Sequence, residues 1–180
     1  MEHPLLPVVM RNRAFADTGA HHHLGTRPKL SAVILTCLDP RVDPAATLGL
    51  QLGDAPVLRN AGGRVTDAVI ADIAFIGFGS GMAQPEGPLF EVAIVHHTGC
   101  GMAALANPDL RHRYAQHTGY PEATLADQAV TDPAHTVATD VARLRAAPQF
   151  PARITVSGHV YDLDTGLITT VISTEPPQAA

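Results

Sequence analysis

Two short segments of the chain place thiols next to other groups that can do chemistry. Residues 37–41 (CLDPR) alternate a thiol, a carboxylate and a guanidinium, and alternate side chains of an extended segment lie on one side. Residues 97–100 (HTGC) separate an imidazole from a thiol by two residues, a gap that lets one loop wrap both around an ion. Zn²⁺ prefers thiolates and imidazoles, and three protein ligands leave a fourth tetrahedral position for water. We therefore expect one catalytic Zn²⁺ per chain, held by Cys37, His97 and Cys100.

Simpler roles for these residues are also open. Cys37 could be an inert core thiol, because unpaired cysteine is among the most buried residue types. Asp39 and Arg41 could form a structural ion pair, and such a pair could also orient a catalytic water. His97 could be a hydrogen-bonded core histidine, and its neighbour His96 is expected to lie on the opposite face of the strand in a structural role. Asp39 and Arg41 share a loop with Cys37, and a carboxylate and a guanidinium are seldom buried without a role or a partner. Their presence therefore argues against an inert Cys37.

Two glycine-containing segments suggest other ligands. Residues 99–104 (GCGMAA) fit the dinucleotide pattern G-x-G-x-x-A, but residues 107–108 (NP) end the following helix early, and no strand with a ribose-binding acid follows within about 20 residues. Gly62 and Gly63 could hold an anion on their backbone amides, or could form a tight turn from a strand into a helix. The second interpretation of this pair is favoured.

The surrounding sequence predicts strands that alternate with helices. Apolar runs typical of buried parallel strands lie at 31–37, 55–59 and 90–96. Helices are expected after a cap at Thr66, ending at glycines 77, 79 and 81, then directly after Gly101, and around 137–144. Residues 153–173 predict two antiparallel strands joined by a turn at 164–166, whereas 109–132 give no clear prediction.

This order of elements predicts an α/β fold, with a mostly parallel central sheet flanked by helices and an antiparallel C-terminal edge hairpin. Ligands of such sheets bind beyond the carboxyl ends of the central strands, where segments 37–41 and 97–100 are expected. Residues 1–28 show little core pattern and are expected to form an N-terminal arm at a dimer interface. Residues 29–180 are expected to form a single zinc-binding α/β domain.

The charge composition of the chain argues against some classes of binding partner. The formal net charge of −5, with 12 Lys and Arg and no basic run, disfavours nucleic acid and anionic membranes. The sequence contains no apolar run of about 18 residues and no N-terminal secretory pattern, so we expect no membrane span and a cytoplasmic location. We expect no disulfide between the two cysteines, because disulfides are rare in the cytoplasm.

Several further motifs accompany these two segments: Gly53-Asp54, residues 59–62 (RNAG), Gly101-Met102, and residues 158–162 (GHVYD) with Thr165-Gly166 near the C-terminal end. In combination, from about Ala32 onward, the chain resembles the beta-class carbonic anhydrases, most closely their short, actinobacterial-type branch. The resemblance implies a homodimer, or a higher multiple of dimers, whose N-terminal helices embrace the partner.

The resemblance also implies an activity and roles for residues. It implies a zinc enzyme that interconverts carbon dioxide and bicarbonate, with Cys37, His97 and Cys100 as ligands and Asp39 with Arg41 as a catalytic dyad. We expect the dyad to orient a zinc-bound hydroxide that attacks carbon dioxide and yields bicarbonate and a proton. The alternatives are a carbon disulfide or carbonyl sulfide hydrolase on the same scaffold, and a non-enzymatic zinc-binding or sensing domain.

Overall fold

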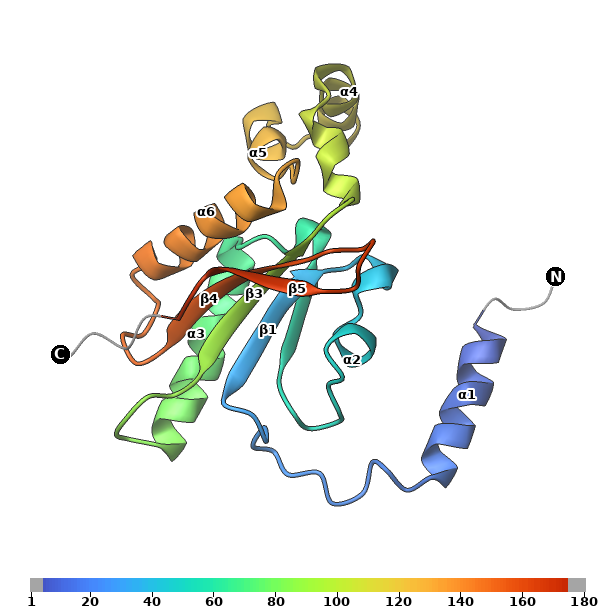
Figure 1. Ribbon diagram of the computed structural model, residues 1–180, viewed down its shortest axis with the longest axis vertical. Coiled ribbons are helices and arrows are strands. Elements are labelled where there is room, and N and C mark those ends of the chain that lie inside the picture. The colour runs from blue at the N-terminus through green and yellow to red at the C-terminus, as the bar shows by residue number, and fades with distance from the viewer. Residues whose placement is uncertain (1–4, 175–180) are drawn as a thin grey trace.

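A five-stranded sheet forms the centre of the computed structural model, which describes residues 5–174 (Figure 1). The strand order is β2-β1-β3-β4-β5, in which the first four strands are parallel and β5 runs antiparallel to β4. The strands are β1 (Ala32–Cys37), β2 (Val57–Asn60), β3 (Glu91–His97), β4 (Thr155–Tyr161) and β5 (Ile168–Ile172). The predicted fold class, with its antiparallel edge hairpin, is confirmed.

Helices and shorter helical turns connect these strands. The α-helices are α1 (Leu6–Asp17), α2 (Pro44–Thr47), α3 (Asp67–Ala83), α4 (Pro108–Thr118), α5 (Glu122–Asp127) and α6 (Pro133–Ala146). Three 3₁₀ turns are η1 (Pro40–Val42), η2 (Ala61–Gly63) and η3 (Gly101–Ala106). The short helix expected after Gly101 is thus a 3₁₀ turn. No helix among residues 5–174 has the length and hydropathy needed to cross a bilayer.

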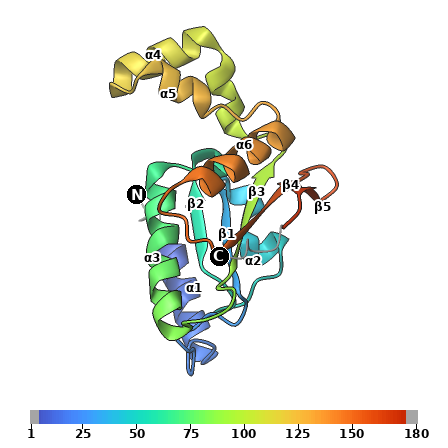
Figure 2. The same cartoon turned by 90° about the vertical axis from the view of Figure 1, so that its left-hand side faces the viewer.

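The main core lies between one face of the sheet and two helices, α3 and α6 (Figure 2). Alternate residues of the central strands point toward this core, as in Val33 and Leu35 of β1. Ile73 of α3 and Leu144 of α6 meet them there and are fully buried. This packing fixes the sheet whose carboxyl edge carries the candidate site.

Helix α3 corrects one prediction, because it passes through all three glycines that were expected to end it. Its start is as predicted, since the hydroxyl of Thr66 accepts a hydrogen bond from the amide of Val69. A Cβ atom at Gly77 would lie 2.9 Å from Ile154, so the missing side chain permits close helix packing. Tertiary packing therefore outweighs the low helix propensity of glycine.

Residues 109–132, which gave no clear prediction, fall largely in the two helices α4 and α5. Asn107 caps α4 by accepting hydrogen bonds from the amides of Asp109 and Leu110, so the Asn-Pro pair that ends η3 also starts the next helix. Both views show α4 and α5 projecting beyond one end of the sheet (Figures 1 and 2). Their mixed sequence hides the usual apolar stripe because neither helix covers the main core.

Helix α1 lies apart from the sheet and is joined to it by an extended segment (Figure 1). None of its residues is buried within the chain. Residues 1–4 of the predicted arm and residues 175–180 of the predicted domain lie outside the described residues.

Candidate metal centre

The ends of two adjacent parallel strands bring the predicted ligands together. Cys37 is the last residue of β1 and His97 is the last residue of β3, and the register pairs Thr36 with Val95. Both strands therefore end at the same edge of the sheet. The loop after β3 turns back through Gly99, which adopts a φ of 63°, and places Cys100 beside the other two.

The three ligand atoms form a buried cluster of the size that a tetrahedral ion requires. They lie within 4.8 Å of one another, and the two sulfur atoms of Cys37 and Cys100 are 4.0 Å apart. Two sulfurs bound to one zinc at about 2.3 Å would lie about 3.8 Å apart. A disulfide needs a sulfur separation of about 2.05 Å, and both cysteines are free thiols. The cluster is therefore of a size that could hold a metal ion.

The imidazole of His97 is oriented for a ligand role. Its Nδ1 lies 2.8 Å from the carbonyl oxygen of Thr98, so Nδ1 carries the proton and donates it to this acceptor. Nε2 then bears the lone pair, and it is buried with no hydrogen-bond partner. A buried nitrogen that faces two thiols and lacks a partner is what a metal-binding histidine presents before its ion is bound.

The two thiols of the cluster differ in their acidity. The hydrogen bond with Cys100 lowers the pKa of Cys37 to about 4, against the opposing effect of burial. The imidazole of His97 lowers it further, as do the backbone amides of Asp39 and Gly62, which lie 3.4 and 3.3 Å from its sulfur. The same hydrogen bond raises the pKa of Cys100, and burial raises it further. An ion that binds both sulfurs would displace the proton of Cys100.

Asp39 and Arg41 form a forked ion pair next to the cluster. The guanidinium donates from Nε to Oδ1 at 2.9 Å and from Nη2 to Oδ2 at 2.6 Å, and the backbone amide of Arg41 also donates to Oδ1. These hydrogen bonds hold the pKa of Asp39 well below its usual range. Arg41 also donates to the carbonyl oxygen of Gly99, which joins the two site loops. The carboxylate of Asp39 lies outside the cluster formed by the three ligand atoms.

Sequence analysis missed Arg59, which organises the first site loop. Its guanidinium donates to the carbonyl oxygens of Cys37 and Asp39 and to the carboxylate of Asp43. The motif RNAG at 59–62 was noted only as part of a resemblance. Its partners lie 16 to 22 residues away along the chain, so no local spacing could reveal these contacts.

The structure also decides the open questions about neighbouring residues. Gly62 and Gly63 form a tight turn against the end of β1, where a Cβ at Gly63 would lie 2.9 Å from the Cys37 nitrogen. The Gly62 amide donates to the Cys37 sulfur rather than standing free for an anion. His96 lies on the opposite face from His97, as expected, with ring nitrogens near Thr136 and the carbonyl oxygen of Gly63.

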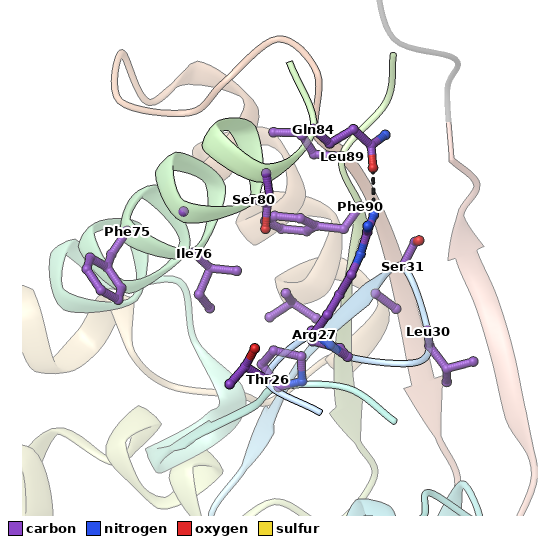
Figure 3. Close-up of a pocket in the computed structure, with 16 residues that line it drawn as sticks. Thr26, Arg27, Leu30, Ser31, Phe75, Ile76, Ser80, Gln84, Leu89 and Phe90 are labelled. Carbon is purple, nitrogen blue, oxygen red and sulfur yellow. Dashed lines mark hydrogen bonds between the residues drawn. The ribbon is translucent and has the colours of Figure 1, made fainter. Parts of the chain in front are cut away.

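Two cavities flank the sheet at opposite ends. One of about 760 Å³ lies at the metal end, between η3 and the α4–α5 pair, and is lined in part by Ala61, Met102 and Leu105. The other, of about 410 Å³, lies near the start of β1, where Arg27 reaches across to Gln84 (Figure 3). The described residues that line this second cavity include no cysteine, histidine or carboxylate, so it is separate from the metal centre.

Comparison with known proteins identifies the family. Residues 32–168 match the family model described as carbonic anhydrase. The chain is 30% identical to beta-carbonic anhydrase 1 of Mycobacterium tuberculosis, over 80% of this chain and 83% of that protein. It is also 30% identical to a carbon disulfide hydrolase of Acidithiobacillus thiooxidans, over 74% and 73% of the two chains.

A solved structure agrees with this result. The carbonic anhydrase of Streptococcus mutans superposes with a TM-score of 0.80 and 34% sequence identity, covering 95% of this chain and 99% of that one. The matched region contains both strand ends that carry the buried Cys-His-Cys cluster. The chain is therefore an enzyme of the beta-carbonic anhydrase family, the carbonate dehydratase class of lyases.

Proposed function

We propose that the protein catalyses the reversible hydration of carbon dioxide to bicarbonate and a proton, with one zinc ion per chain held by Cys37, His97 and Cys100. The observation that carries the proposal is the buried, unpartnered Nε2 of His97 facing two thiols beside the Asp39–Arg41 pair. When bound, zinc would acidify a water molecule and so supply a nucleophile near neutral pH.

The ion pair orients this nucleophile. An ionised carboxylate can only accept hydrogen bonds, so Asp39 binds a nucleophile that still has a proton to donate and leaves its lone pair free for the substrate. Arg41 occupies both carboxylate oxygens in a forked geometry, which fixes the direction in which Asp39 accepts. The link from Arg41 to Gly99 holds the carboxylate at a set distance from the ligand loop.

The surroundings of the site suit a small apolar substrate. The cavity at the metal end is lined largely by apolar side chains, among them Met102, Leu105 and Leu110. Two of the residues that line it lie next to the cluster in the sequence: Gly101 follows Cys100, and Ala61 precedes Gly62, whose amide contacts the Cys37 sulfur. Carbon dioxide would be favoured over water in such a cavity, whereas charged bicarbonate would leave it.

Hydrolysis of carbon disulfide or carbonyl sulfide is the second candidate. It is favoured by the similarity to the carbon disulfide hydrolase of Acidithiobacillus thiooxidans. These substrates are also small and apolar, and the same ligands and dyad would serve them.

Stopped-flow assays with a pH indicator test the proposal against this alternative. We expect protein containing about one zinc per chain to hydrate carbon dioxide well above the buffer blank. The rate should rise above neutral pH. Two thiolate ligands would reduce the charge of the ion, so the nucleophile would form only at higher pH. Turnover of carbon disulfide or carbonyl sulfide without turnover of carbon dioxide would favour the second candidate. Inactivity of the zinc-containing protein toward all three substrates would contradict both candidates.

We also propose that the N-terminal arm, with α1, joins two copies of the chain into a dimer. A helix of this length is only marginally stable in water by itself. The arm nevertheless exposes Leu6, Val9, Met10 and Phe15 to solvent within a single chain. Such exposed apolar groups mark a surface that binds another protein. A second copy offers an isologous partner for it.

Removing residues 1–25 should lower the solution mass to that of a monomer or destabilise the protein. Val9→Asp should weaken association in the same direction, because it places a charge among the exposed apolar residues. Arg11→Asp is the control: it also introduces Asp into α1, but at a position that is already charged. This variant should associate like the wild type. Light scattering measures all of these masses. A full-length chain that stays monomeric at micromolar concentration would contradict the proposal.

A further inference from the structure

A buried ion pair lies behind the metal centre, between the turn after β2 and helix α6. The guanidinium of Arg64 donates from Nε to Oδ2 of Asp140 at 2.7 Å and from Nη2 to Oδ1 at 3.1 Å. The side chain of Asp140 is 0% exposed and that of Arg64 is 5% exposed. Oδ2 also accepts from the backbone amide of Val65 at 3.2 Å. Both carboxylate oxygens thus accept hydrogen bonds.

The carboxylate of Asp140 also reaches His96. Nε2 of this imidazole lies 3.3 Å from Oδ2 of Asp140 and 3.2 Å from the carbonyl oxygen of Gly63. Because both neighbours are acceptors, Nε2 carries a proton and donates it. Nδ1 lies 2.9 Å from the hydroxyl of Thr136, one helical turn before Asp140. Thr136 and Asp140 of α6 therefore fix the imidazole of His96, which donates a hydrogen bond to the carbonyl oxygen of Gly63.

The turn itself is clamped at its two ends. The side chain of Asn60 accepts from the backbone amide of Arg64 and donates to its carbonyl oxygen. Within the clamp, the amide of Gly62 lies 3.3 Å from the sulfur of Cys37. Gly62 and Gly63 adopt φ values of 82° and 67°, which only glycine takes readily. Because glycine has many accessible conformations, the shape of this turn depends on the contacts that surround it.

Stability alone does not account for this network. A buried ion pair contributes little net stability compared with apolar residues of the same size, because both charges lose their hydration. Helix α6 is already anchored by Val137, Val141 and Leu144 in the main core. Burial alone would raise the pKa of Asp140, and the hydrogen bonds from His96 and Arg64 lower it by more, so the carboxylate is charged. The network thus joins a charged carboxylate on α6 to the turn at residues 60–64, through Arg64 and His96.

We propose that Asp140 is a positioning residue for the sulfur of Cys37. Through Arg64 and His96 it fixes the turn, and the fixed turn presents the amide of Gly62 to the sulfur. A hydrogen bond to a thiolate ligand withdraws charge from the sulfur and sets its orientation toward the ion. The inference rests on the proposed zinc site and adds to it a residue that contacts neither metal nor substrate.

The Asp140→Asn variant tests the proposal because it keeps the size of the side chain but replaces one acceptor oxygen by a donor facing Arg64. We expect its zinc affinity, measured by competition with a chelator, to fall by about 10- to 100-fold. In protein loaded with cobalt, the sulfur-to-metal charge-transfer band should shift to lower energy, since a thiolate that loses an N–H donor carries more charge. Both measurements report on the ligand sulfur rather than on turnover.

Leu144→Ala is the matched control, because it removes a fully buried side chain from the same face of α6 without touching the turn. It should lower the free energy of unfolding yet leave zinc affinity and the cobalt band unchanged. If Asp140→Asn behaves like Leu144→Ala, the ion pair is structural and the proposal is wrong. If the wild type itself binds no zinc, the proposed function fails instead, so the two failures are distinguishable.

Should Asp140→Asn fail to fold, substitutions at Thr136 decide the question. Thr136→Val removes the hydrogen-bond partner of His96 at nearly constant volume, and it should change zinc affinity and the cobalt band in the same direction by a smaller amount. Thr136→Ser keeps the hydroxyl and should restore wild-type values. Equal zinc affinity and an unchanged band in the valine variant would overturn the proposal.

Discussion

Replacing Asp39 by Asn should lower the rate of carbon dioxide hydration by about 10²-fold or more, the scale expected for removing a positioned polar group at a reacting centre. The amide cannot accept two donors from Arg41 on both of its atoms, so the forked geometry of the pair is lost. Because Asp39 is not part of the ligand cluster, the variant should keep its zinc and its fold. Zinc content per chain, circular dichroism and stopped-flow rates measure the three quantities.

Arg41→Ala should reduce the rate in the same direction, since it frees the Asp39 carboxylate from its fixed orientation. The double variant should lose much less than the product of the two single losses, because residues that act as one unit are not additive. Asp72→Asn is a suitable control: it makes the same change at an exposed residue of α3, outside both site loops. Unchanged rates in both single variants of an active enzyme would leave Asp39 and Arg41 as a structural ion pair.

Replacing Cys100 by Ser should reduce the zinc content from about one per chain to near zero and abolish activity. A hydroxyl group does not ionise near neutral pH and is a poor zinc ligand compared with a thiolate. Cys37→Ser and His97→Ala should have the same effect, since each removes one of three ligands. Elemental analysis of protein purified without chelator measures the ratio. Zinc affinity of the wild type should rise with pH, because binding must displace the proton held by Cys100.

The run His21-His22-His23 calls for a control in this experiment, because exposed histidines bind metals adventitiously. A variant with these three residues replaced by Gln should keep one zinc per chain. Adding Cys100→Ser to that background should then remove it. Full zinc content in the Cys37, His97 and Cys100 variants alike would show that the ion binds elsewhere.

The candidate ligands and the strands beside them could be predicted from local sequence. Cys37 ends one β-branched run and His97 follows another, both runs suit buried parallel strands, and parallel strands end at one edge. The short gap to Cys100 requires only a local loop. These features depend on residue type and local spacing, so they can be recognised without knowing the rest of the chain. The alternation of strands and helices gave the fold class for the same reason.

The support of the site depends on contacts between segments that are distant in the sequence. Arg59 binds backbone oxygens of the first site loop, and Asp140 meets Arg64 across 76 residues of sequence. Helix α3 continues through glycines that end isolated helices, because Gly77 allows close contact with Ile154. Such contacts form between surfaces that the folded chain brings together. Their energies depend on burial and distance, which no local pattern of residues contains.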